Sequence, residues 1–156
     1  MNAHDRRHVG WLQVDDIELD ARSTDKRSTL EAMARQLARR HGGNPQTIFV
    51  ALSDRELLGS TGLGHGVALP HARLPGLEHA IGALLRLHRA VAFDAPDDKP
   101  VDLIIGLLLP QRAPERQLAL LGHIAGLLSD ARIRQALLQA RDAPAVVTML
   151  GHGPPG

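Results

Sequence analysis

Residues 55–73 read RELLGSTGLGHGVALPHAR, a glycine-rich run that leads into a short apolar strand ending at Pro70 and His71. Glycine has no Cβ and adopts positive φ readily, so backbone N–H groups in such a run can converge on an anion. Hydroxyl and imidazole side chains add further donors. The predicted phosphate-binding residues are Ser60, Thr61, Gly62, Gly64, His65 and Gly66.

The side chains at the two ends of this run have complementary chemistry. An imidazole with an ordinary pKa of about 6.5 is mostly neutral in the cell, so His71 keeps a lone pair that can accept a phosphoryl group. The guanidinium of Arg55 can contact two phosphate oxygens at once and neutralise their charge. Phosphoryl transfer depends on positioning and charge stabilisation, and this run offers both.

Simpler interpretations of the same residues exist. A glycine-rich loop before a strand is often an ordinary turn, and no Gly-Lys-Ser/Thr follows to make it a nucleotide-binding loop. A histidine at a strand end is often solvated, and an arginine is often a surface cation. His65 and His71 could form a metal pair, but no third ligand lies nearby and zinc usually takes three or four. The conjunction of these features in one run favours phosphoryl chemistry, with no metal and no cofactor.

Hydrophobic periodicity and turn residues predict an alternation of strands and helices along the chain. Strands are predicted at residues 16–20, 67–69, 81–87 and 101–109, and helices from Thr24 or Asp25 to Gly42 and at residues 45–57, 115–128, 130–139 and 144–150. Residues 115–128 are apolar over more than half of the helix circumference, so this helix is expected to lie deep against a sheet. The pattern predicts one α/β layered domain at residues 9–150, with flexible ends at residues 1–8 and 151–156.

Composition excludes several classes of function. The chain has 156 residues, of which 44% are hydrophobic, which suits one domain. Its 18 Lys and Arg against 17 Asp and Glu give no basic surface that would indicate nucleic-acid binding. No cysteine and no export-type segment are present, so the expected location is the cytoplasm. The longest apolar stretch, residues 101–109, contains Asp102 and is too short to cross a bilayer, so no membrane insertion is expected.

Residues 60–77, STGLGHGVALPHARLPGL, resemble the active-site segment of the enzyme IIA domains of the phosphotransferase system, in the fructose, mannitol and nitrogen-related class. The Gly-x-x-x-Pro-His signature stands here at residues 66–71 and ends at His71. The resemblance continues at Arg55-Glu56, Phe93-Asp94, Pro-Val-Asp-Leu at 100–103, residues 107–110 and residues 118–128, and covers about residues 12–150. Leu-Gly-Ser-Thr-Gly and Leu-Pro-Gly-Leu are most similar to the nitrogen-related subgroup.

The resemblance implies a mixed five-stranded β-sheet flanked by α-helices on both faces. It also implies that His71 takes a phosphoryl group on Nε2 from an HPr-type phosphocarrier protein or its nitrogen-branch counterpart. In this scheme Arg55 stabilises the phosphoryl oxygens, assisted by Ser60, Thr61 and nearby backbone amides. The phosphorylated protein would then regulate partner proteins, which the sequence does not identify.

One position departs from the family pattern. Family members usually carry a second histidine at the start of the helix after the third long strand, and here that position is Gln117. Glutamine can hydrogen-bond but cannot become cationic, and His123 lies nearly two helical turns further on. Three alternatives therefore stay open: a fructose or mannitol-branch IIA component, a binding module of the same fold that is not phosphorylated, and a metal-dependent hydrolase.

Overall fold

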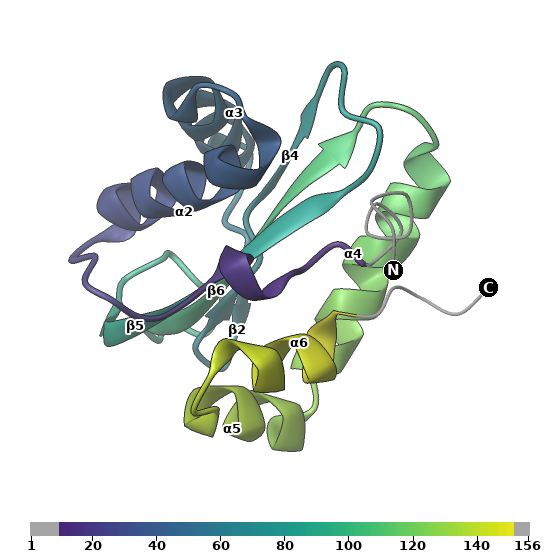
Figure 1. Ribbon diagram of the computed structural model, residues 1–156. Coiled ribbons are helices and arrows are strands. Elements are labelled where there is room, and N and C mark those ends of the chain that lie inside the picture. Colours follow the sequence, from purple (N-terminus) through teal and green to yellow (C-terminus); the bar gives the residue numbers. More distant parts are fainter. Residues whose placement is uncertain (1–9, 152–156) are drawn as a thin grey trace.

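The computed structural model describes residues 10–151, and strands and helices alternate along them (Figure 1). The elements in chain order are the 3-10 helix η1 (Val14–Asp16), β1 (Ile17–Ala21), α2 (Lys26–His41), α3 (Pro45–Leu57), β2 (Gly62–Gly64), β3 (Val67–Ala68), β4 (His71–Leu74), β5 (Ile81–Val91), β6 (Val101–Pro110), α4 (Pro114–Leu128), α5 (Ala131–Gln139) and α6 (Ala143–Leu150). The predicted α/β class is confirmed.

The strands form one mixed sheet with the order β1-β5-β6-β3-β2, and β4 also pairs with β6. The two long strands β5 and β6 are antiparallel at its centre. β1 runs parallel to β5, β3 and β4 run parallel to β6, and β2 pairs antiparallel with β3. The sheet has six strands rather than five. The extra strand arises because β3 and β4 lie one after the other along β6, with Leu69 and Pro70 between them. Pro70 has no N–H to donate to a ladder, which interrupts the strand there.

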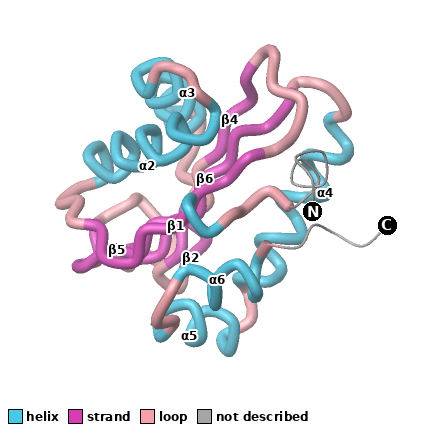
Figure 2. The backbone as a smooth tube through the Cα atoms, viewed as in Figure 1, coloured by secondary structure: helices cyan, strands magenta, loops and turns pink. Residues whose placement is uncertain are grey.

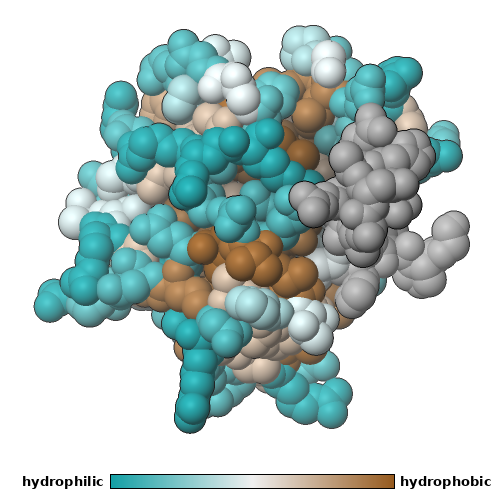
Figure 3. Space-filling model, viewed as in Figure 1, coloured by the Kyte–Doolittle hydropathy of each residue, from teal (hydrophilic) through white to brown (hydrophobic). Residues whose placement is uncertain are grey.

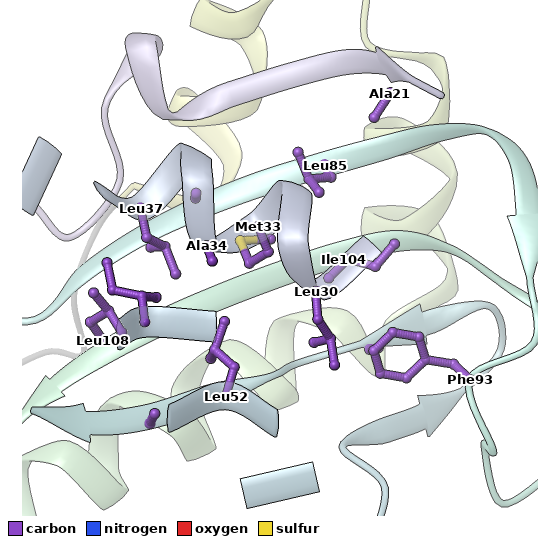
Figure 4. Close-up of a cluster of buried hydrophobic side chains, with 14 of the residues drawn as sticks. Ala21, Leu30, Met33, Ala34, Leu37, Leu52, Leu85, Phe93, Ile104 and Leu108 are labelled. Carbon is purple, nitrogen blue, oxygen red and sulfur yellow. The ribbon is translucent and has the colours of Figure 1, made fainter. Parts of the chain in front are cut away.

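Helices cover both faces of the sheet, as expected, with α2 and α3 on one face and α4, α5 and α6 on the other (Figures 1 and 2). The strand residues alternate between the two cores, because successive side chains of a strand point to opposite faces. Ala83 and Leu85 of β5 lie in the core with α2, and Leu84 between them lies in the core with α4. Figure 4 shows the first core, in which Leu30, Met33, Ala34 and Leu37 of α2 face Leu85, Ile104 and Leu108 of the sheet.

Two glycines in the central strands allow this close packing. An added Cβ at Gly82 would lie 2.4 Å from Cε3 of Trp11, and one at Gly106 would lie 2.3 Å from Sδ of Met33. Both neighbours are buried, at 4% and 0% exposure. These glycines leave room for one large side chain on each face of the sheet.

Capping residues define where the predicted helices α2 and α3 begin and where α2 ends. The carboxylate of Asp25 accepts a hydrogen bond from the backbone N–H of Ser28, so Asp25 rather than Thr24 is the N-cap of α2. Gly42 ends this helix with a φ of 82°. Asn44 caps α3, which begins at Pro45 as predicted.

The chain ends differ in part from the predicted boundaries. Residues 1–8 and 152–156 of the predicted flexible ends lie outside the described residues. Gly151 is buried, and its N–H donates to the carbonyl of Val147 at 2.7 Å, so it packs with the end of α6 rather than in a tail. Between residues 10 and 151, no helix is long and apolar enough to span a membrane. On the face shown in Figure 3, hydrophilic side chains cover much of the surface and a hydrophobic area lies near the centre.

Candidate functional site

His71 is positioned by the hairpin that β2 and β3 form. The N–H of Leu69 donates to the carbonyl of Thr61 at 3.0 Å, and the N–H of Leu107 donates to the carbonyl of Pro70 at 3.0 Å. His71 is the first residue of β4 and pairs in register with Leu107 of β6. The predicted strand at residues 67–69 therefore ends one residue earlier, and His71 begins a new strand.

The His71 ring is held by one hydrogen bond to the backbone. Its Nδ1 lies 2.9 Å from the carbonyl oxygen of Leu69, and only a protonated Nδ1 can donate to that oxygen. The neutral ring therefore carries its lone pair on Nε2. Burial lowers the pKa of His71, and the charges of Arg55 and Arg73 lower it further, against the Leu69 hydrogen bond and the Glu56 carboxylate, which raise it. These effects keep the ring neutral and nucleophilic at neutral pH.

Two adjoining hollows open beside His71 and share the side chains of Arg55, His71 and Leu121. The larger has a volume of about 570 Å³ and is lined by Ala51, Asp54, Arg55, Leu58, His71, Ala72, Arg73, Leu109, Leu118 and Leu121. The smaller has a volume of about 290 Å³ and is lined by Arg55, Ser60, Thr61, Gly62, Leu63, Leu69, His71, Leu121, Gly122 and Ala125. Arg55 and His71 thus come together at one site.

Arginine side chains supply the positive charge of this site. Arg55 lies in the last turn of α3, and its Nη1 donates to the carbonyl of Gly59 at 2.9 Å, which fixes the guanidinium against the loop. Arg73 also lines the larger hollow. Sequence reasoning did not single it out, although residues two apart in a strand point to the same side, and Arg73 is two residues after His71.

The hydroxyls of the loop are already bonded within the protein. Ser60 Oγ donates to the carbonyl of Phe93 at 2.8 Å and accepts from the N–H of Gly62 at 3.0 Å. Thr61 donates its N–H and its hydroxyl to the carboxylate of Glu56, which is 9% exposed. Ser60, Thr61 and Gly62 line the smaller hollow, so their role in binding phosphate stays a prediction. The two hydroxyls chiefly fix the shape of the loop through the hydrogen bonds described above.

Gly64 is the last residue of β2, His65 and Gly66 form the turn between β2 and β3, and none of the three lines either hollow. His65 has a φ of 56°, and its N–H donates to Oδ2 of Asp97 at 2.9 Å. Gly66 stands beside the carboxylate of Asp102, whose pKa is raised by burial. These three residues therefore face the protein's own carboxylates, Asp97 and Asp102, and not the two hollows beside His71. No group of three or more His, Asp or Glu side chains in residues 10–151 could hold a metal ion.

Gln117 lies in the first turns of α4, is 8% exposed and lines neither hollow. Its Nε2 donates to the carbonyl of Arg112 at 3.3 Å, in the loop before the helix. The expected deep burial of this helix is wrong for one side of it. Leu118 is 70% exposed and Leu121 is only partly buried, and both line the larger hollow, although Leu121 also packs against the core.

The whole arrangement has counterparts among known proteins. Residues 11–152 match the family model of the phosphoenolpyruvate-dependent sugar phosphotransferase system, EIIA 2. A nitrogen regulatory protein of Pseudomonas aeruginosa is 46% identical over 122 residues, which is 78% of this chain and 79% of the relative. One from Bradyrhizobium diazoefficiens is 40% identical over 129 residues, 83% of this chain and 84% of the relative.

A solved structure supports the same assignment. The crystal structure of nitrogen regulatory protein IIA-Ntr from Neisseria meningitidis superposes with a TM-score of 0.86 at 40% identity, covering 90% of this chain and 96% of that one. The resemblance to the nitrogen-related subgroup is therefore confirmed by sequence and by fold. This chain belongs to the EIIA 2 family of the phosphoenolpyruvate-dependent sugar phosphotransferase system.

Proposed function

We propose that this protein is a phosphoryl-accepting relay and regulatory protein of the nitrogen-related phosphotransferase system, acting in the cytoplasm. His71 receives the phosphoryl group from an HPr-type phosphocarrier, and the phosphorylated form regulates partner proteins. The observation that carries the proposal is the His71 ring itself. Its Nδ1 is held by the carbonyl of Leu69 at 2.9 Å, which leaves a free Nε2 beside Arg55 in an open hollow.

The transfer step needs no cofactor. The lone pair of Nε2 attacks the phosphorus, and a P–N bond forms while the bond from phosphorus to the donor atom of the carrier breaks. The electron pair of that bond stays on the carrier. Arg55 and Arg73 face the same hollow and offset the charge of the phosphoryl oxygens. The Nδ1–H bond to Leu69 stabilises the ring as its charge increases.

The rim of the larger hollow supports a protein as the phosphoryl donor. Leu58 is 84% exposed and Leu118 is 70% exposed, and both line the hollow. Large apolar side chains gathered on a surface are typical of protein interfaces. Together with Arg55 and Arg73 they favour a partner with an apolar centre and an acidic rim. An added phosphoryl dianion at the centre of this surface changes its charge, which gives the phosphorylation state a way to control binding.

The test is phosphorylation of the purified protein by phosphoenolpyruvate, enzyme I and the cognate carrier. We expect an acid-labile phosphohistidine in the wild type and none in His71→Ala. His123→Ala, which removes another imidazole from the helix facing the site, is the matched control and should be phosphorylated normally. Absence of phosphohistidine in the wild type, or its persistence in His71→Ala, contradicts the proposal.

One observation favours a second function, a binding module of the same fold that does not carry phosphate. His71 is the sole imidazole among the residues that line the two described hollows, and Gln117, at the position where the family usually has a second histidine, is turned toward Arg112. A Gln117→His variant separates the two functions. Phosphorylation of the wild type at a rate similar to that of Gln117→His supports the relay. Phosphorylation that appears only in Gln117→His, with partner binding unchanged in His71→Ala, supports the binding module.

A further inference from the structure

A third hollow lies at the far end of β5 from His71. Its volume is about 470 Å³, and its lining includes Arg22, Ser23, Thr24, His88, Arg89 and Val91. Gly82 is the β5 residue opposite Leu107, the partner of His71 in β6, so His88 is six positions further along the strand. At about 3.3 Å per strand residue, roughly 20 Å separates this hollow from the acceptor histidine.

The hollow exists because two strand pairings end at the same place. β1 stops at Ala21, which pairs with Leu87, and the chain then turns away toward α2. On the other side, β5 pairs with β6 at Arg86 and next at Val91, with an irregularity between them. Residues 88–90 therefore form an irregular part of β5 beside the end of β1, and they line the hollow together with residues 22–24.

The side chains around this space are those that recognise oxyanions. Arg22 and Arg89 reach it from two different segments of the chain, and two hydroxyls and an imidazole lie beside them. Guanidinium groups contact phosphate and carboxylate oxygens in pairs, and hydroxyls and imidazole add single bonds. The volume is within the range of small-molecule sites, which is about 300–1,000 Å³.

The polar groups are partly preorganised and partly free. Asp20 holds two of them, since its carboxylate accepts from Nη2 of Arg22 at 2.8 Å and lies 3.1 Å from Nδ1 of His88. Those two hydrogen bonds lower the pKa of Asp20. Within the described part of the chain, the guanidinium of Arg89 and the hydroxyls of Ser23 and Thr24 have no hydrogen-bond or ion-pair partner. Two arginines against one aspartate leave a net positive charge facing the space.

We propose that this hollow binds a small oxyanionic metabolite of the phosphomonoester class through Arg22, Arg89 and the hydroxyls of Ser23 and Thr24. The site is separate from His71, so the bound anion and a phosphoryl group can be present together. Anion binding in this hollow does not depend on whether His71 is phosphorylated. Either the anion site or the phosphorylation of His71 can therefore be disproved without affecting the other.

The test is a titration of the isotope-labelled full chain with inorganic phosphate, followed by NMR at constant ionic strength. We expect shifts concentrated at residues 22–24 and 88–91. Arg89→Gln should raise the dissociation constant about tenfold or more, which is the loss expected for a charge-assisted hydrogen bond. Arg22→Gln should have a smaller effect in the same direction, because Arg22 also pairs with Asp20.

Two controls separate this site from other sources of binding. Arg132→Gln removes an arginine of the same kind, which pairs with Asp130 two residues before it as Arg22 pairs with Asp20. It should leave phosphate binding unchanged. Arg55→Gln removes the anion ligand at the His71 site and should not move the shifts at residues 88–91. Equal losses in all three of Arg89→Gln, Arg22→Gln and Arg132→Gln, or shifts confined to the residues around His71, overturn the proposal.

Discussion

Replacing Glu56 with alanine should destabilise the protein by about 3 kcal/mol. The Glu56 carboxylate accepts the N–H of Thr61 at 3.1 and 3.2 Å, accepts the Thr61 hydroxyl, and pairs with Nζ of Lys26 at 3.0 Å. Glu56→Ala leaves the N–H of Thr61, a residue 5% exposed, without its acceptor, at a cost of about 1–3 kcal/mol. Breaking a buried ion pair costs about 3–5 kcal/mol. The lower end applies because Lys26 keeps Asp94 at 3.2 Å.

Chemical denaturation in urea measures this loss directly, as the difference in the free energy of unfolding. The control is Glu31→Ala, which removes a glutamate from an exposed ion pair with Arg27 whose side chains are 40% and 76% exposed. An exposed pair of this kind contributes about 0.5 kcal/mol or less. If Glu56→Ala differs from Glu31→Ala by less than about 1 kcal/mol, the Glu56 network does not hold the loop and the reasoning is refuted.

Three further predictions concern other parts of the molecule. Because burial lowers the pKa of His71 below 6.5, the unfolded chain takes up a proton first as the pH falls. The contribution of His71 to stability is therefore full above pH 6.5 and decreases below it, and an NMR titration of the ring should give a pKa below 6.5. Gly106→Ala should cost about 1–3 kcal/mol by overpacking against Met33, whereas Gly126→Ala, in open space on α4, should stabilise by up to about 1 kcal/mol, both measured by urea denaturation. Arg55→Gln should slow phosphorylation of His71 about 10-fold or more with little change in thermal stability, and an unchanged rate would contradict its assigned role.

Local signals in the sequence were enough to predict most of the fold. Asn44 and Pro45 define the start of α3 because a capping side chain and a preset φ act within one turn. The strands β5 and β6 are also visible locally, because each contains a continuous apolar run bounded by turn residues or polar residues, which is typical of a strand buried on both faces. The pairing of His71 with Leu107 joins residues far apart in the chain, and no local pattern specifies such a register.

The difference between local patterns and contacts across the chain also explains which parts of the site were predicted. Arg55 and His71 were found because their side-chain chemistry is visible in one run of residues. The sequence did not predict that Gly64, His65 and Gly66 lie outside the two hollows. Their position depends on contacts with Asp97 and Asp102, which belong to a different segment of the chain. Glycine allows positive φ, and here that freedom makes a tight hairpin turn rather than a longer anion cradle.

The interruption of the strand at Pro70 links the fold to the chemistry of His71. The carbonyl of Pro70 points to β6, where it accepts the N–H of Leu107, whereas the N–H of Leu69 points the other way and donates to Thr61. Because the N–H and C=O of one strand residue point to the same side, the Leu69 carbonyl lies outside the ladder with β6. Leu69 lies between β3 and β4, and its carbonyl accepts the His71 ring at 2.9 Å. That single contact selects the tautomer with a free Nε2. The two residues before His71 therefore have separate roles, since the Pro70 carbonyl anchors the segment to β6 and the Leu69 carbonyl orients the ring.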